Sequence, residues 1–415
     1  MPENAHQYTD SDPVVAQYER WAYPAPVNDL ADPSIARYLA TFLTLRNMSL
    51  VYWPAGQPRE DLDILVAGCG TMAAACYAHH YPRCRITGID ISRTSLAHHE
   101  RLKQRHNLLN LTLHHCPIEQ VGSLDGQFDY ISCHGVLHHL PDPAAGLAAL
   151  KGVLRQDGVI ALMLYARYGR AAVYAFQDLF RMIGLEQSPE DVAIVRQTLS
   201  ALPADHPLGL YLRRATDLDN DAGLVDTFLH RRDQAYRVSD CLALLNDAGL
   251  VFQGWDRNFF YHADGLFAGA PMLRDRINRL PRDQAWQAVE LAFGMIGTHW
   301  FFACRPDRDP LAYQMPWESA ALFNCIPIAG AKLLPKPDPG GAPQWAVARP
   351  NFPAVALTAR QAAIFSQIDG RRTVGQCLVA AGVEGGEPSR LAAAQDCFQL
   401  LWRIGFGILR LPKSA

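Results

Sequence analysis

Short apolar runs alternate with longer amphipathic stretches between Asp61 and Ala166. The apolar runs have the length of strands and lie at residues 64–67, 85–89, 111–114, 128–133 and 159–166. Strands that alternate with amphipathic helices are typical of a parallel sheet covered by helices on both faces. The pattern therefore predicts an α/β fold in which a doubly wound, Rossmann-like sheet occupies residues 61–306.

One helix of this region has clear boundary signals. Asp142 is a good N-cap residue, and Pro143 fits the first helical position after it. Apolar residues then recur at helical spacing as far as Leu154, and Gly158 follows. We expect a helix from Pro143 to about Leu154.

The strand rhythm stops after the fifth apolar run. Residues 167–235 carry helical patterning instead, at 168–185, 189–201 and 206–215. This stretch is interpreted as a helical insertion, placed where the carboxyl ends of the strands open into a crevice.

After the insertion, Ser239 is expected to cap a further helix. Residues 250–261 and 298–305 then have the apolar and aromatic content of a final antiparallel strand pair.

The two ends of the chain differ from the central region. Residues 1–60 combine a polar start with an aromatic cluster, and they are predicted to form an N-terminal cap. The cluster consists of Tyr18, Trp21, Tyr23 and Trp53.

Proline and glycine recur after Arg305, so residues 307–345 are predicted to be a linker. Beyond it, Thr358 with Gln361 and Thr373 with Gln376 match the capping box that opens a helix. Residues 406–411 have the pattern of a closing strand. Residues 346–415 are therefore expected to form a small helical, winged-helix-like domain, and they show a short resemblance to winged-helix peptide-binding modules.

Length and charge narrow the range of functions. The 415 residues are enough for two or three compact units with substantial cores. Lys and Arg number 38 against 41 Asp and Glu, a formal charge of −3, so no overall attraction to nucleic acid or to a membrane surface is expected. No apolar run reaches the roughly 20 residues of a membrane span.

The ten cysteines are scattered, with no C-x-x-C pair and no signal-like segment after the polar start. Reduced thiols and a cytoplasmic location are therefore expected.

Residues 64–90 contain the clearest chemical signal. An apolar run leads into the turn Gly68-Cys69-Gly70, an alanine-rich helical stretch follows, and the next apolar run ends at Asp90. A strand that feeds directly into a helix aims the first N–H groups of the helix at a ligand, and glycine lets the ligand approach the backbone. A carboxylate roughly 20 residues on accepts hydrogen bonds from a ribose. This turn fits a nicotinamide dinucleotide and S-adenosylmethionine equally well.

Four segments in the same order separate these two cofactors. They are GCGT at 68–71, GIDIS at 88–92, FDYI at 128–131 and VLHHL at 136–140. Together they resemble the class I S-adenosylmethionine-dependent methyltransferases, whose last strand is similar to HWFFACRP at 299–306. The resemblance implies a Rossmann-like methyltransferase sheet, S-adenosylmethionine as cofactor, and methyl transfer to a nitrogen, oxygen or carbon acceptor.

The resemblance also implies roles for individual residues. The turn would approach the methionine and ribose parts of the cofactor, Asp90 would bind the ribose hydroxyls, and residues after the third strand would lie at the adenine. The family often places an acid there, against the adenine amino group, and in this sequence that acid is missing unless Glu119 substitutes for it. The expected cofactor-binding residues are Gly68, Cys69, Gly70, Asp90, Ile91, Pro117, Ile118, His134 and Gly135.

His134 is the candidate catalytic base, and Tyr165 and Tyr23 are candidates to contact the methyl acceptor. In related methyltransferases the N-terminal segment lies over the cofactor, so Tyr18 and Trp21 are candidate pocket residues too. The alternative, that these aromatic side chains cover the edge of the sheet, stays open.

Two positions depart from the family pattern. Val66 stands where an acidic residue is usual, and Met72 replaces a third glycine. They motivate one alternative, a non-catalytic scaffold that retains the cofactor.

The acceptor is left open between a peptide or protein side chain and a small metabolite, and a homo-oligomer is possible. Adjacent histidine pairs suggest a metal, but neighbouring side chains on a strand or helix diverge, so no metal is expected.

Overall fold

The computed structural model describes residues 12–33, 35, 45–336 and 344–412. They form two compact units. The first consists of the described residues of Met1–Thr44, Arg59–Phe252 and Gly294–Pro306, and the second of those of Leu45–Pro58, Gln253–Phe293 and Asp307–Ala415.

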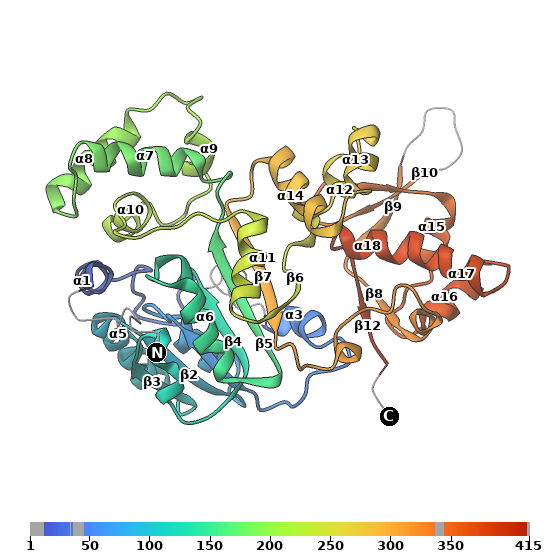
Figure 1. Ribbon diagram of the computed structural model, residues 1–415, viewed down its shortest axis with the longest axis horizontal. Helices are drawn as coiled ribbons and strands as arrows, with labels where there is room; N and C mark the ends of the chain where they lie inside the picture. Colours follow the sequence, from blue (N-terminus) through green and yellow to red (C-terminus); the bar gives the residue numbers. More distant parts are fainter. Residues whose placement is uncertain (1–11, 34, 36–44, 337–343, 413–415) are drawn as a thin grey trace. The chain divides into compact units, whose positions relative to one another are not determined.

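A seven-stranded sheet in the order β3-β2-β1-β4-β5-β7-β6 has six of its strands in the first unit, and its last strand, β6, begins there (Figure 1). Strands β1 to β5 run parallel, and β7 pairs antiparallel with β5. The bounds are β1 Asp63–Ala67, β2 Arg85–Asp90, β3 Leu111–His115, β4 Phe128–His134, β5 Leu154–Tyr165, β6 Val251–Trp255 and β7 Thr298–Cys304. The predicted doubly wound α/β sheet is confirmed.

The sheet is covered by α4 (Ala73–His80), α5 (Arg93–His106) and α6 (Pro143–Gly152) among others. In β4, the first six residues are buried, as expected for a central parallel strand with both faces covered. Gly88 in β2 allows α4 to pack closely, because a Cβ there would lie 2.7 Å from the Cβ of Ala74.

Helix α6 begins as predicted and ends earlier. The Asp142 carboxylate accepts a 2.9 Å hydrogen bond from the Ala145 amide, which is the expected cap. The prediction that the helix reaches Leu154 was wrong, because Leu154 begins β5 and lies opposite Phe128 of β4. Its apolar side chain is buried through the sheet and not through the helix.

The insertion after β5 folds into four helices, α7 (Ala171–Met182), α8 (Pro189–Ser200), α9 (Gly209–Leu212) and α10 (Asp221–Phe228) (Figure 1). The sequence patterning predicted the first three and missed α10. These helices share a core of buried side chains, which includes Val173, Phe180, Val192, Val195, Leu224 and Phe228.

Helix α11 (Val238–Asp247) follows the insertion and starts one residue before the predicted cap Ser239. The Asp240 carboxylate accepts a 2.8 Å hydrogen bond from the Arg237 amide, so Arg237 occupies the cap position instead.

Helix α1 (Pro13–Arg20) connects the insertion to the sheet. The Glu19 carboxylate accepts a 2.6 Å hydrogen bond from the Thr94 hydroxyl at the start of α5. On the insertion side, Gln17 accepts a 2.7 Å hydrogen bond from Gln187. This helix is therefore hydrogen-bonded both to the start of α5 and to the insertion.

The second unit contains two small antiparallel sheets, β11-β10-β9 and β12-β8, and several short helices. Its main elements are α3 Leu45–Tyr52, α12 Ala263–Leu266, α13 Pro271–Ile277, α14 Arg282–Phe293, β8 Ile326–Ala329, β9 Lys332–Lys336, β10 Gln344–Ala348, β11 Val355–Leu357, α15 Ala359–Phe365, α16 Val374–Ala380, α17 Glu387–Ala394, α18 Leu400–Arg403 and β12 Gly407–Arg410.

Both capping boxes are present, since Thr358 and Thr373 each accept from the amide three residues on. The predicted closing strand is β12. The winged-helix assignment stays a prediction.

Two boundary predictions need correction. The expected linker 307–345 contains β8 and β9, because its apolar residues pair with other strands, as Ile328 does with Ile408 of β12. Residues 337–343 of it lie outside the described residues. The expected cap 1–60 is also not one piece, since α3 belongs to the second unit. There the side chain of Arg308, 1% exposed, donates to the Tyr52 carbonyl oxygen at 2.9 Å.

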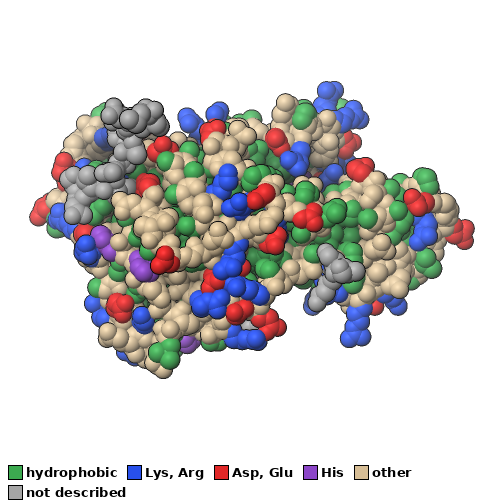
Figure 2. Space-filling model, turned by 60° about the horizontal axis from the view of Figure 1, so that its bottom comes forward, with side chains coloured by type: hydrophobic (Ala, Val, Ile, Leu, Met, Phe, Trp, Pro, Cys, Tyr) green, Lys and Arg blue, Asp and Glu red, His purple; other side chains and the backbone are tan. Residues whose placement is uncertain are grey.

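Among the described residues, no helix has both the length and the apolar content that crossing a membrane requires. Figure 2 shows acidic and basic side chains intermingled on one face of the molecule, in keeping with the nearly balanced composition.

Candidate cofactor and acceptor site

A cavity of about 1250 Å³ lies at the carboxyl ends of β1, β2, β4 and β5. Typical small-molecule pockets have about 300–1,000 Å³, so this one has room for a cofactor and a second ligand. The predicted site residues that line it are Tyr23, Gly68, Cys69, Gly70, Asp90, Ile91, Ile118, His134, Gly135 and Tyr165. Pro117 is not among the lining residues; it precedes a 3₁₀ turn, Ile118–Ser123, that carries its neighbours to the cavity.

The turn after β1 requires glycine at two positions. Gly68 and Gly70 have φ values of 69° and 56°, in the left-handed region. A Cβ on Gly68 would lie 2.4 Å from Val136, and one on Gly70 would lie 2.9 Å from Pro24. The N-terminal segment and the segment after β4 therefore pack directly against the turn.

Asp90 is held in a defined orientation beside this turn. Its carboxylate accepts hydrogen bonds from the amides of Gly70, at 2.7 Å, and Ser92, at 2.9 Å. The residue is 8% exposed, and burial raises the pKa of Asp90 to about 6, partly opposed by the backbone donors. Because it lines the cavity, its remaining acceptor capacity fits the hydroxyl groups of a ribose.

Glu119 is a second carboxylate that can accept a hydrogen bond from a ligand in the cavity. It lines the cavity, and among the described residues its buried Oε2 atom has no hydrogen-bond partner. Burial raises the pKa of Glu119. An unpartnered buried acceptor is costly unless a ligand supplies a donor, so this atom fits an exocyclic amino group such as that of adenine.

His134, the predicted base, ends β4 and lines the cavity. Its Nδ1 atom lies 3.1 Å from the Ser132 hydroxyl, and its ring lies 4.9 Å from that of Trp300. Burial lowers the pKa of His134 to about 3. The imidazole is therefore neutral at ordinary pH, but it accepts a proton poorly.

Three tyrosine side chains are also among the described residues that line the cavity. Tyr18 and Tyr23 come from the N-terminal segment, and Tyr165 ends β5. The Tyr23 hydroxyl donates to Asp217, and the Tyr18 hydroxyl donates to Asp226 at 2.9 Å. Trp21, in contrast, packs against the core of the insertion.

Both carboxylates belong to the insertion, and neither was predicted as a site residue from the sequence. Asp217 precedes α10 and Asp226 lies within it. Asp226 is 2% exposed and does not line the cavity itself, since Tyr18 and Tyr165 lie in front of it. Burial raises the pKa of Asp226 to about 7. No local motif marks either residue.

The charged side chains that line the cavity are mostly acidic. Arg214 is the one arginine or lysine among the described lining residues. Burial also lowers the pKa values of His134 and His139, so neither contributes positive charge. The carboxylates are Asp29, Asp32, Asp90, Glu119 and Asp217.

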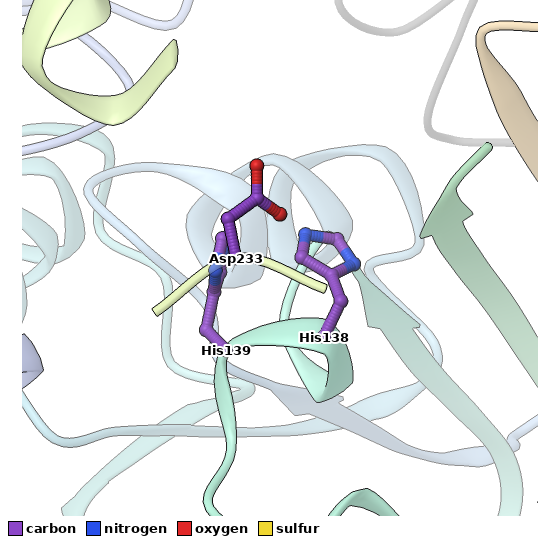
Figure 3. Close-up of side chains that lie close together, drawn as sticks. All are labelled: His138, His139 and Asp233. Carbon is purple, nitrogen blue, oxygen red and sulfur yellow. The ribbon is translucent and has the colours of Figure 1, made fainter. Parts of the chain in front are cut away.

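Within the described part of the chain, two sets of side chains lie close enough together to hold a metal ion. Figure 3 shows the first, in which His138 and His139 lie side by side with Asp233 over them. The buried Arg170 guanidinium lies 3.7 Å from the Asp233 carboxylate. A divalent cation would therefore meet a buried positive charge, which disfavours it.

The second set is His139, Asp226 and His230. The Nδ1 atom of His230 accepts a 3.0 Å hydrogen bond from the Arg232 amide, so Nε2 carries the proton of the neutral ring. A protonated nitrogen is not a ligand. We assign no metal to either set, and the expected absence of a metal stays a prediction.

The sequence comparisons agree with the geometry of the site. Residues 65–162 match the family model described as a methyltransferase domain. The chain is 32% identical over 284 residues to an uncharacterized protein, syc1184_c, from a Synechococcus strain, covering 65% of this chain and 67% of that protein. It is also 32% identical over 119 residues to a ubiquinone biosynthesis O-methyltransferase from Aromatoleum aromaticum, covering 27% of this chain and 47% of that protein.

Among solved structures, the chain resembles PKMT2 from Rickettsia typhi in complex with AdoHcy, with a TM-score of 0.57 and 15% identity. The match covers 88% of this chain and 74% of that one, and at this identity it shows a shared fold. The chain belongs to the class I S-adenosylmethionine-dependent methyltransferases. It is a methyltransferase, and its cofactor is S-adenosylmethionine.

Proposed function

We propose that this methyltransferase acts on an amine, carried on a peptide or protein side chain such as that of lysine. The observation that supports this proposal most strongly is the acidic, tyrosine-lined wall of the cavity. Apart from Asp90 and Glu119, which are assigned to the cofactor, the described lining residues include three carboxylates, Asp29, Asp32 and Asp217, and a single arginine. An ammonium group is attracted to such a wall, whereas an anionic acceptor is repelled.

The tyrosine side chains suit an ammonium group in a second way. Aromatic faces attract cations, and this attraction strengthens as water is removed. Tyr23 is further oriented by its hydrogen bond to Asp217. The neutral state of His134 means that the histidine beside the fourth strand does not repel a cation.

The cofactor, when bound, supplies an electrophilic methyl group on a sulfonium. The residues of this chain would hold it through the glycine turn, through Asp90 at the ribose, and through Glu119 at the adenine amino group. Alignment of acceptor and methyl group can supply roughly 7–11 kcal/mol of such a barrier. Tyr165 and Tyr18, at the edge of the same cavity, would position the nitrogen.

Methyl transfer to defined probes tests the proposal. Purified full-length protein is incubated with radiolabelled S-adenosylmethionine and one of several acceptors: a lysine-containing peptide, the same peptide with norleucine, benzylamine, or a phenol. Label on the lysine peptide and not on the norleucine peptide supports a peptide amine. Label on benzylamine alone assigns a small amine, and label on the phenol alone overturns the proposal.

Variants of the wall connect this activity to the site. Asp217→Asn removes one lining charge and is expected to raise KM for the amine about tenfold, with little change in the affinity for S-adenosylhomocysteine. If the protein binds S-adenosylhomocysteine but labels none of the acceptors, the scaffold alternative is favoured. A cytoplasmic location, the absence of nucleic-acid and membrane partners, and the oligomeric state stay predictions.

A further inference from the structure

Tyr18 lies at the centre of a continuous hydrogen-bonded chain that runs from the cavity into the insertion. The His230 Nε2–H donates to the Tyr18 oxygen at 3.1 Å, because the Nδ1 atom of that ring already accepts from the Arg232 amide. The Tyr18 hydroxyl then donates to Asp226 Oδ1 at 2.9 Å. A phenolic oxygen has one proton and two lone pairs, so one lone pair of Tyr18 remains for a ligand in the cavity.

We propose that Tyr18 is a catalytic residue that transfers the proton of the acceptor amine to Asp226, which stores it during methyl transfer. His230 acts as a positioning residue, because its Nε2–H occupies one lone pair of Tyr18 and leaves the hydroxyl proton directed at Asp226. The choice of an amine rests on the proposed function above. The hydrogen-bonded chain itself does not.

The reaction requires such a proton store. Lysine has an ordinary pKa of about 10.4, so its nitrogen arrives protonated and has no lone pair with which to attack. The cavity-lining His134 takes up a proton poorly, for the reason given above. Asp217 accepts the Tyr23 hydroxyl in the same way, but it lines the cavity and is assigned above to attracting the ammonium group. Asp226, in contrast, is buried and does not line the cavity. It accepts a hydrogen bond from the Tyr18 hydroxyl, which does line the cavity.

The protons and electrons balance in this scheme. The ammonium N–H bond breaks, and its proton goes to the Tyr18 oxygen, while the Tyr18 proton moves to Asp226. Tyr18 therefore stays neutral throughout, in agreement with the burial that raises its pKa. The nitrogen lone pair then forms a bond to the methyl carbon, the carbon–sulfur bond breaks, and the sulfur keeps the electron pair. Asp226 afterwards returns its proton to the cavity through Tyr18, which lines it.

The groups around Asp226 give its carboxylate a pKa that suits proton uptake and release near neutral pH. Tyr18 and Tyr165 face it from α1 and β5, at hydroxyl distances of 2.9 and 3.5 Å. Six other ionisable groups lie around Asp226. They are Tyr23, His139, Arg170, Asp217, His230 and Asp233. Burial raises the pKa of Asp226 to about 7, so the carboxylate can both take up and release a proton near neutral pH.

The first test follows the pH dependence of methyl transfer in the full-length protein with the lysine peptide. Asp226→Asn and Tyr18→Phe are each expected to lower kcat by 10²–10⁴-fold at pH 7, the range of a general base. The deficit should shrink toward pH 10, where the amine loses its proton unaided. The double variant should be no slower than the worse single variant. A deficit that is constant with pH would indicate a structural role and overturn the proposal.

A conservative variant and a matched control accompany these measurements. Asp226→Glu retains a carboxylate and should recover part of the rate. Asp178→Asn removes an exposed carboxylate of α7 that pairs with Arg181, and it should leave kcat unchanged. Binding of S-adenosylhomocysteine by calorimetry checks that each variant is folded.

A second readout does not depend on any acceptor. Infrared spectroscopy of the protein with S-adenosylhomocysteine should show a protonated-carboxyl band that disappears as the pH rises through about 7. The band should be absent in Asp226→Asn and shifted in Tyr18→Phe. If this band is found but no amine is methylated, the proposed acceptor is wrong and the proton store stands. If no such band titrates near neutral pH, the proton store is wrong whatever the acceptor.

Discussion

The Gly70 amide donates a 2.7 Å hydrogen bond to the Asp90 carboxylate, so the turn after β1 and the end of β2 form one unit. The carboxylate is thereby oriented before any ligand binds. Its backbone partners also mean that a change at Asp90 affects the turn as well as the ribose.

Asp90→Asn is expected to weaken binding of S-adenosylhomocysteine at least tenfold, since charge-assisted hydrogen bonds are worth about 1.5–3 kcal/mol each. In the wild type, affinity should also fall as the pH drops below about 6, where Asp90 takes up a proton. Calorimetric titration at pH 5 and pH 8 measures both effects, with Asp178→Asn as the control. Equal affinity of wild type and variant at pH 8 would remove Asp90 from the site.

Gly70→Ala is expected to destabilise the turn and weaken cofactor binding. The residue has a left-handed φ of 56°, and the new Cβ would meet Pro24. A non-glycine residue held in such a conformation costs about 1–3 kcal/mol. Gly122→Ala, with open space around the added Cβ and no left-handed φ, is the matched control. Thermal unfolding and S-adenosylhomocysteine titration should separate the two variants, and similar behaviour would contradict this account.

Asp226→Asn is expected to stabilise the protein at alkaline pH relative to the wild type. An unfolded Asp has a pKa of about 3.9, whereas burial raises the folded value to about 7. The native state therefore binds more protons between these pH values, so this group makes the wild type less stable as the pH rises from 4 to 7. Asparagine has no charge to bury and can still accept from the Tyr18 hydroxyl. Chemical denaturation at pH 5 and pH 8 measures the difference, which should be of the order of a few kcal/mol at pH 8. A variant less stable than the wild type at both pH values would show that the carboxylate is mainly structural.

Removal of metal ions is expected to change neither cofactor affinity nor methyl transfer. The protonated Nε2 of His230 and the guanidinium of Arg170 disfavour a cation at the two histidine clusters. Dialysis against a chelator followed by elemental analysis and activity measurement tests this. One equivalent of zinc in the purified protein, lost on His139→Ala together with activity, would show that a metal is bound there.

Several features were determined by residues that are close together in the sequence. The turn at Gly68 and Gly70, the carboxylate at Asp90 and the cap at Asp142 each depend on backbone geometry within one strand, turn and helix. Local patterning identifies them because their hydrogen bonds close over a few residues or over one strand-helix-strand unit. The class of cofactor was predicted from these segments and is confirmed.

Other features depended on competition between local preference and packing. Leu154 fits the helical spacing, yet it pairs in the sheet opposite Phe128 because burial there is complete. Residues 326–336 contain two prolines, yet they supply two strands, because β8 pairs with β12, far along the chain, and β9 pairs with the nearby β10. The periodicity of apolar residues does not predict which distant strand a segment will pair with.

The sequence by itself determined the sheet, the turn and the ribose carboxylate, since each rests on local backbone geometry. Only the tertiary structure decided the acceptor wall. Tyr18 meets Asp226 across 208 residues, and Tyr23 meets Asp217 across 194. These contacts exist because α1 packs against both the start of α5 and the insertion, and such long-range packing leaves no spacing or motif along the chain.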